Sequence, residues 1–245
     1  MMRLVTVSST LRATYVDGDG VERSAPLDSI DARQVADGLP VRMPPSYVGQ
    51  RHYPGHFWSS TMGRHVVYES LLERDWLWTA DFDPSVVRIA AQPILIEGFD
   101  GAAKRTRFPD FMCLAVDGRV HVVDVKAPQA LSKPEVTTAL DWTRRVIEER
   151  GWSYEVWTGA SRTVLRNIQM IAAGRLSWVC DEQSLEVVVR EARSTTTIEE
   201  LERRLLSQPD LTSLPRLAIL AALWKGRLRC DMTVPLARSS WIGVA

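Results

Sequence analysis

Residues 107–126 read RFPDFMCLAVDGRVHVVDVK, and this stretch decides the fold of the chain. Its second half, RVHVVDVK, has β-branched residues with period-2 character, and the Asp-Gly pair before it is a hairpin turn signal. The first half, RFPDFMCLAV, is also typical of a strand. The stretch therefore predicts two antiparallel strands, which would bring Asp110 near Asp124.

Asp110, Asp124 and Lys126 form a candidate catalytic group within this hairpin. Asp124 and Lys126 are two residues apart in one strand, so they project to the same face, while Val125 points to the opposite, apolar one. Two carboxylates and an ammonium are what metal-assisted phosphodiester hydrolysis needs: bound Mg²⁺ polarises the phosphate and acidifies a water, and the lysine stabilises the developing charge. Taken singly, PD and DxK are common patterns and are also typical of ordinary strand-end charges.

A third carboxylate occurs upstream of the hairpin. Residues 64–80 read RHVVYESLLERDWLWTA and predict a helix with Val67, Leu71 and Trp78 near one stripe and with Glu69 inside it. Three carboxylates and a lysine in this order are much less expected by chance than either motif alone.

With the run VVRIAAQPILIE at 86–97, these motifs resemble the nuclease domain of TnsA, the endonuclease subunit of heteromeric transposases, within the PD-(D/E)xK nuclease superfamily. The match covers residues 55–157. The resemblance implies an α/β fold with a restriction-endonuclease-like mixed sheet flanked by helices. It also implies that Glu69, Asp110 and Asp124 are the acidic metal-site residues and that Lys126 is the catalytic lysine.

The same resemblance implies a cofactor and partners. Mg²⁺ is the expected cofactor, and Mn²⁺ is expected to substitute for it. The expected substrate is double-stranded DNA at transposon ends, and the expected partners are a transposase subunit and an AAA+ ATPase. Two alternatives stay open, a stand-alone restriction or defence nuclease and a non-catalytic DNA-binding assembly module. The intact set of acidic residues favours an enzyme, because a scaffold has no need for mutually repelling carboxylates on one face.

The charge distribution offers only local support for DNA binding. The chain has 245 residues and a formal net charge of +0, so no global electrostatic attraction to nucleic acid exists. Basic residues cluster before the active-site proline and near the carboxy terminus, and a solvated surface explains such clusters equally well. The candidate DNA-binding residues are Lys104, Arg105, Arg107, Arg144, Arg227 and Arg229.

Cysteine usage and hydropathy indicate a reduced, cytoplasmic protein. The 3 cysteines are widely separated and form neither a CxxC metal site nor a disulfide framework, and the 4 histidines form no HExxH motif. No apolar run approaches the roughly 20 residues of a membrane span, and residues 1–10 lack a signal-peptide profile.

The chain is expected to divide into three parts: a hairpin and connector at 1–55, the nuclease domain at 56–193 and a winged-helix-like partner- or DNA-binding domain at 194–245. The sequence around DGDG predicts a hairpin over 14–27, and the Pro- and Gly-rich residues 29–55 predict a connector. Periodicity and capping signals predict helices over 134–151, 161–173, 197–206 and 217–224, and strands over 152–158, 228–234 and 241–244. The order helix, Pro-rich break, helix and β-ribbon is the outline of a winged helix.

Overall fold

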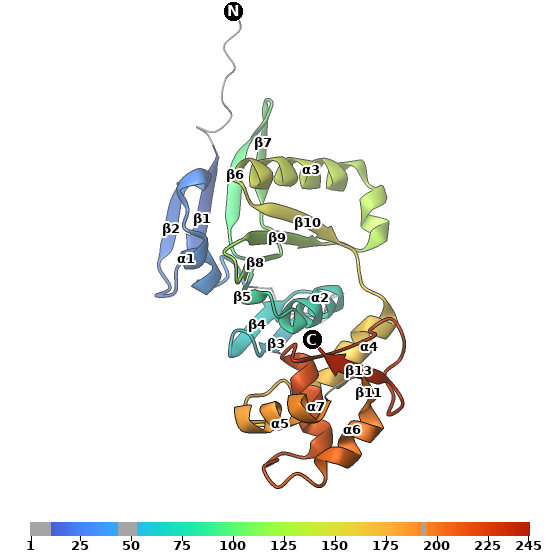
Figure 1. Ribbon diagram of the computed structural model, residues 1–245. Coiled ribbons are helices and arrows are strands. Elements are labelled where there is room, and N and C mark those ends of the chain that lie inside the picture. The colour runs from blue at the N-terminus through green and yellow to red at the C-terminus, as the bar shows by residue number, and fades with distance from the viewer. Residues whose placement is uncertain (1–10, 44–52, 193–194) are drawn as a thin grey trace, which may run out of the picture. The chain divides into compact units, whose positions relative to one another are not determined.

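The computed structural model describes residues 11–43, 53–192 and 195–245 (Figure 1). The chain folds into two compact units. The first comprises Met1–Ala80 with Ser85–Gly159, and the second comprises Asp81–Pro84 with Ala160–Ala245. The division expected at residue 193 is therefore wrong, because the helices that precede this residue pack with the carboxy-terminal elements.

A mixed sheet carries the predicted hairpin. Its strand order is β10-β9-β8-β5, with β9 parallel to β10 and with antiparallel pairing elsewhere. The predicted hairpin is confirmed, and Gly118 provides the positive φ of 84° that its turn requires. The bounds are Val86–Ala91 for β5, Phe111–Ala115 for β8, Val120–Val125 for β9 and Ser153–Trp157 for β10.

A second, antiparallel sheet contains the amino-terminal hairpin, in the order β2-β1-β6-β7. The predicted DGDG turn is confirmed, and the Asp17 carboxylate accepts hydrogen bonds from the Asp19 and Val21 amides. Arg107 ends β7, so the strand expected over 107–116 is split in two at Pro109, which has no N–H to donate. The bounds are Arg12–Val16 for β1, Glu22–Pro26 for β2, Leu95–Asp100 for β6 and Ala103–Arg107 for β7.

The helix expected over 64–80 is wrong in its first part. Arg64–Tyr68 is strand β4, which pairs with β3 (Gly55–Ser59), and helix α2 spans only Leu71–Phe82. The β-branched residues Val66 and Val67 are both buried, which fits a strand better than a helix. Glu69 therefore lies in the bend between β4 and α2 and not inside a helix.

The remaining helices of the first unit lie in the segments around these sheets. Helix α1 (Ala32–Asp37) falls within the expected connector, of which residues 44–52 lie outside the described part of the chain. The short helix η2 (Leu27–Ser29) precedes α1, and η3 (Pro128–Ser132) precedes α3. Helix α3 (Pro134–Glu149) confirms the helix predicted there and packs beside β10 (Figure 1).

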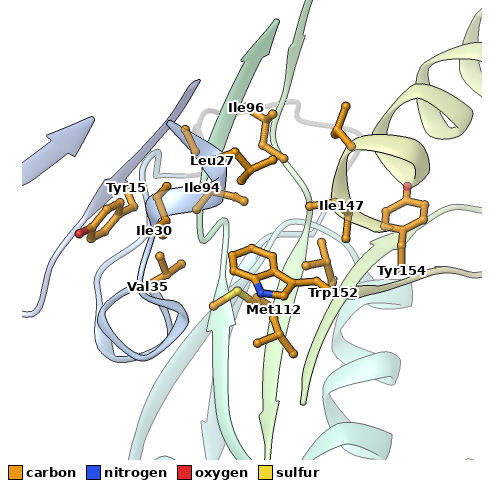
Figure 2. Packing of buried hydrophobic residues seen from close by; sticks show 14 of the residues in the cluster. Tyr15, Leu27, Ile30, Val35, Ile94, Ile96, Met112, Ile147, Trp152 and Tyr154 are labelled. Carbon is orange, nitrogen blue, oxygen red and sulfur yellow. The ribbon is translucent and has the colours of Figure 1, made fainter. Parts of the chain in front are cut away.

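One apolar core joins the amino-terminal hairpin to the mixed sheet. Tyr15 and Val35, from the hairpin and α1, belong to the same buried cluster as Met112 and Trp152 (Figure 2). Ile147 contributes from α3. Residues 11–43 are therefore part of the first unit and not a separate attachment.

The second unit is mainly helical. Its three-stranded sheet has the order β11-β13-β12, and the predicted capping box of Thr197 and Glu200 at the start of α6 is confirmed. Helix α7 is apolar on all sides, and residues 218–224 are all buried. The bounds are Arg162–Ile171 for α4, Ala172–Gly174 for η4, Glu182–Ala192 for α5, Thr196–Thr197 for β11, Ile198–Leu205 for α6, Pro215–Trp224 for α7, Leu228–Cys230 for β12 and Trp241–Val244 for β13.

Within the described residues, none of the helices combines the length and apolar character that crossing a membrane requires.

Candidate functional site

The hairpin brings three of the four predicted site residues together. Asp110 directly precedes β8, Asp124 lies in β9 and Lys126 follows β9. Phe111 pairs with Val123 in the β8–β9 register, which sets the two aspartates at the same end of the hairpin. The Lys126 amide donates to the Trp157 carbonyl at 2.9 Å, so β10 fixes the backbone after the strand.

The ammonium of Lys126 is held among three oxygen atoms. It donates to Asp110 Oδ2 at 2.8 Å and to the Val125 carbonyl at 3.1 Å, and it lies 3.5 Å from Asp124 Oδ1. Asp110 Oδ2 also accepts a hydrogen bond from the Val125 amide at 2.7 Å. The positive charge of Lys126 thus lies between two buried carboxylates and reduces their mutual repulsion.

Burial shapes the protonation of this group. Desolvation is the largest effect on Asp110 and raises the pKa of its carboxyl, while the charge of Lys126 opposes that shift. Desolvation also disfavours the Lys126 ammonium, but the charges of Asp110 and Asp124 outweigh it and raise the pKa of the lysine. Lys126 is therefore positively charged at neutral pH.

Asp124 has further partners. Its side chain is fully buried, and both of its oxygens lie 3.1 Å from Nη2 of Arg107. The Tyr154 hydroxyl donates to Asp124 Oδ2. Burial and then the Asp124 charge raise the pKa of Tyr154, so the phenol keeps its proton and acts as a donor. Residue patterns in the sequence do not connect Tyr154 to the site.

The fourth predicted residue, Glu69, has a different partner. Its Oε1 lies 3.1 Å from Nη2 of Arg42 as an ion pair, and the same nitrogen donates to Oε2 at 3.2 Å. Arg42 also donates to the Gln92 side chain at 2.9 Å and stacks over the Phe108 ring, 5.0 Å from its centroid. Glu69 is thus held by an arginine.

Glu73 is the carboxylate on α2 whose pKa is raised by burial and by the charge of Asp110. Its side chain is buried, and desolvation together with the Asp110 charge raises its pKa to about 7. The glutamate accepts hydrogen bonds from the Glu69 amide at 2.8 Å and the Ser70 hydroxyl at 3.0 Å. The prediction that Glu69 lies inside the helix is wrong, because α2 begins at Leu71 and carries Glu73 in its first turn.

Local sequence and packing explain the position of Glu73. The Ser70 hydroxyl accepts a hydrogen bond from the Glu73 amide at 3.1 Å, which is the helix-starting pattern of a serine followed three residues later by glutamate. This signal would have placed the helix start at Ser70. One turn further along α2, Trp76 stacks on Phe111 with 4.3 Å between the ring centroids. Because Phe111 follows Asp110 directly, this stacking sets the Glu73 face of α2 toward Asp110.

Most of the candidate DNA-binding cations form ion pairs within the chain. Arg107 faces Asp124 and does not form part of a surface patch. Three others have acidic partners: Lys104 pairs with Glu97, Arg105 with Asp100 and Arg227 with Glu182. Arg144 pairs with Glu148 and donates to the Tyr154 carbonyl, whereas Arg229 is exposed on β12.

The oxygen atoms of Asp110 and Asp124 are suitable ligands for a hard divalent cation. The structure does not, however, show a group of three or more His, Cys, Asp or Glu side chains that could hold a metal ion among the described residues. In the structure, Lys126 and Arg107 are the ion-pair partners of the two aspartates. The oxygens around the ammonium of Lys126 are of the type that Mg²⁺ prefers. Asp110, Asp124 and the Val125 carbonyl therefore fit such an ion, with Glu73 as a third carboxylate nearby.

Comparisons of the chain with protein-family models and with curated proteins find no match.

Proposed function

We propose that the chain is a Mg²⁺-dependent DNA endonuclease subunit of a heteromeric transposase, which cleaves phosphodiester bonds at the ends of a mobile element. The observation that carries this proposal is the ammonium of Lys126, which contacts oxygens of Asp110, Asp124 and Val125. Converging oxygens that hold one positive group also favour a divalent cation. The transposition setting and the partners rest on the resemblance to TnsA-like subunits.

Each residue has a defined part in this proposal. Asp110, Asp124 and the Val125 carbonyl would hold the ion, and Glu73 would add a carboxylate from α2, in place of Glu69. When bound, Mg²⁺ supplies Lewis acidity that polarises the phosphate and acidifies a water. Lys126 would contact the phosphate and stabilise the negative charge that develops on it.

The architecture supports the proposed domain types. The mixed sheet of the first unit is compatible with a restriction-endonuclease-like fold. In the second unit, the order α5, β11, α6, α7, β12 and β13 with strand order β11-β13-β12 supports a winged-helix-like module. Because α7 is buried, we propose that this module meets DNA or the transposase and ATPase partners through other surfaces, such as the strand that carries Arg229.

A second candidate function is a non-catalytic DNA-binding assembly module. The observation that favours it is that the oxygens of Asp124 are already engaged by Arg107, Lys126 and Tyr154. A stand-alone defence nuclease would share the chemistry of the first proposal and would differ from it only in its partners.

Metal binding and DNA cleavage test the proposal together. We expect the purified chain to bind Mn²⁺ in isothermal titration calorimetry and to cut DNA carrying element ends when supplied with Mg²⁺ and its partner proteins. Asp110→Ala and Lys126→Ala should each reduce cleavage by at least about 10²-fold, since each removes a group that acts on the reacting centre. Asp141→Ala, at an exposed position of α3, is the matched control and should cut normally.

The two glutamates refine this test. Glu73→Gln should weaken Mn²⁺ binding and cleavage, whereas Glu69→Gln should leave Mn²⁺ binding close to that of the unaltered chain. Full cleavage by Asp110→Ala or Lys126→Ala would overturn the enzymatic proposal. DNA binding without Mn²⁺ binding or cleavage would favour the assembly module.

A further inference from the structure

Asp124 has more hydrogen-bond and ion-pair partners than a carboxylate needs in order to bind a metal ion. Its side chain is fully buried on β9, and hydrogen-bond donors reach it from β7 and β10. Burying a carboxylate without partners costs several kcal/mol, so these donors are needed for the charge to exist at all. They also decide in which direction each of its oxygens points.

Tyr154 reaches Asp124 because of the sheet register. Strands β9 and β10 are parallel, and Val156 pairs with Asp124. Tyr154 lies two residues before Val156, so its side chain emerges on the same face of the sheet as that of Asp124. The phenol is 6% exposed and donates to Oδ2 of Asp124.

Arg107 approaches Asp124 from the other sheet, and α3 orients it. Its Nε donates to the Thr143 hydroxyl at 3.1 Å, and that hydroxyl donates to the Ala139 carbonyl at 2.9 Å. Thr143 is fully buried, so the guanidinium has a fixed support in the helix. A hydrogen-bonded chain thus runs from α3 through Arg107 to Asp124.

The result is an Asp124 carboxylate with two different oxygens. Oδ2 receives the tyrosine hydroxyl, Oδ1 lies 3.5 Å from the ammonium of Lys126, and Nη2 of Arg107 lies 3.1 Å from both. We infer that Tyr154, together with Arg107 and its support Thr143, acts as a positioning residue that presents Oδ1 of Asp124 to a divalent cation. This inference rests on the proposed function, and it assigns roles to residues that do not themselves touch the ion or the DNA.

Outer-shell partners of metal-binding carboxylates hold their ligands in the binding orientation, and their loss weakens metal binding by roughly 10- to 100-fold. Tyr154→Phe removes only the hydroxyl and keeps the ring. Thr143→Val removes the support of Arg107 but leaves the guanidinium charge in place. Both variants should therefore raise the Kd for Mn²⁺ in isothermal titration calorimetry by about 10-fold or more.

A matched control separates positioning from general loss of stability. Tyr15 is also 6% exposed, belongs to the same unit and donates its hydroxyl to Gln34 Oε1 at 2.7 Å. Tyr15→Phe should lower the urea midpoint in the same way as Tyr154→Phe but leave the Mn²⁺ Kd unchanged. Circular dichroism checks that each variant is folded.

The outcomes are distinguishable. If the unaltered chain binds Mn²⁺ and both Tyr154→Phe and Thr143→Val bind it with a Kd within twofold of that value, the positioning role is wrong and the proposed function stands. If Tyr15→Phe weakens binding as much as Tyr154→Phe does, the effect reflects stability and the inference also fails. If the unaltered chain binds no Mn²⁺, the proposed metal site itself fails, and the inference fails with it.

Discussion

Glu69 and Glu73 show how four residues of separation produce two different chemical environments. The Glu69 carboxylate turns to the partly exposed guanidinium of Arg42, while its amide donates to the buried carboxylate of Glu73. Desolvation disfavours a charged carboxylate, and the nearby Asp110 charge adds to this effect. Glu73 is therefore the carboxyl in this site that is poised to exchange a proton near neutral pH.

The pKa of Glu73 predicts a pH dependence of stability. The folded-state pKa of Glu73 is raised to about 7 from the ordinary glutamate value of 4.5, so the folded protein keeps the proton over a range in which the unfolded chain has lost it. The resulting stabilisation of the folded state is fully present below about pH 4.5 and is lost as the pH rises through about 7. The free energy of unfolding changes by an amount on the order of 3 kcal/mol over this range. Urea denaturation at a series of pH values, without divalent cations, measures it.

Glu73→Gln should flatten this pH dependence, because an amide cannot lose the proton. Glu69→Gln, four residues away, is the control and should retain the slope. An unchanged slope in Glu73→Gln would show that burial of this carboxyl does not control its ionisation.

At the scale of elements, α7 is the helix whose stability depends most on the elements packed around it. Its sequence, PRLAILAALW, is apolar on every side, and such a helix is stable in water only when other elements cover it. Helices α4, α5 and α6 and the short helix η4 all pack against α7. At the η4 contact, a Cβ added to Gly174 would lie only 2.2 Å from the Ala221 backbone nitrogen. The absence of a side chain at Gly174 therefore permits this close approach.

Gly174→Ala should destabilise the second unit by about 1–3 kcal/mol, because the new methyl group meets helix backbone that cannot move aside easily. Thermal unfolding monitored by circular dichroism measures the effect. Gly243→Ala is the matched control in the same unit, since its added Cβ would be 3.9 Å from Oγ1 of Thr195, an ordinary contact. Equal melting temperatures for the two variants would contradict the tight packing at η4.

At the scale of the whole molecule, the chain enters the second unit twice. Residues 81–84, which contain the end of α2, belong to it, as do all residues from 160 onward. Phe82 makes an edge contact with Trp224 of α7, with 5.3 Å between the ring centroids. The candidate site lies wholly in the first unit, so chemistry and carboxy-terminal contacts are assigned to separate units.

This division predicts how truncated chains behave. A chain ending at Gly159 removes the second unit except for residues 81–84 and should retain Mn²⁺ binding in calorimetry. A chain ending at residue 193 keeps α4 and α5 without α7, which exposes Ile171, Leu185 and Val188 that are buried in the intact protein. We expect this longer chain to aggregate in size-exclusion chromatography with light scattering. A monomeric chain ending at 193 alongside an aggregating chain ending at 159 would place the boundary at 193 after all.

The sequence by itself determined the features that depend on neighbouring residues. The turn at Gly118, the capping box at Thr197 and the common face of Asp124 and Lys126 follow from backbone geometry over a few positions. The sequence also indicated that Asp110 meets Asp124, because the short turn around Asp117 and Gly118 sets the register of the strands that carry them.

Only the tertiary structure decided which distant groups complete the site. Val66 and Val67 form a strand because β3 pairs with them, and this pairing moves the helix start to Leu71 and leaves Glu73 on α2 within reach of the Asp110 charge. The contacts of Arg107 and Tyr154 with Asp124 join strands of two sheets and depend on register and burial. Such contacts link residues 17 and 30 positions apart in the chain, so local residue patterns carry no signal for them.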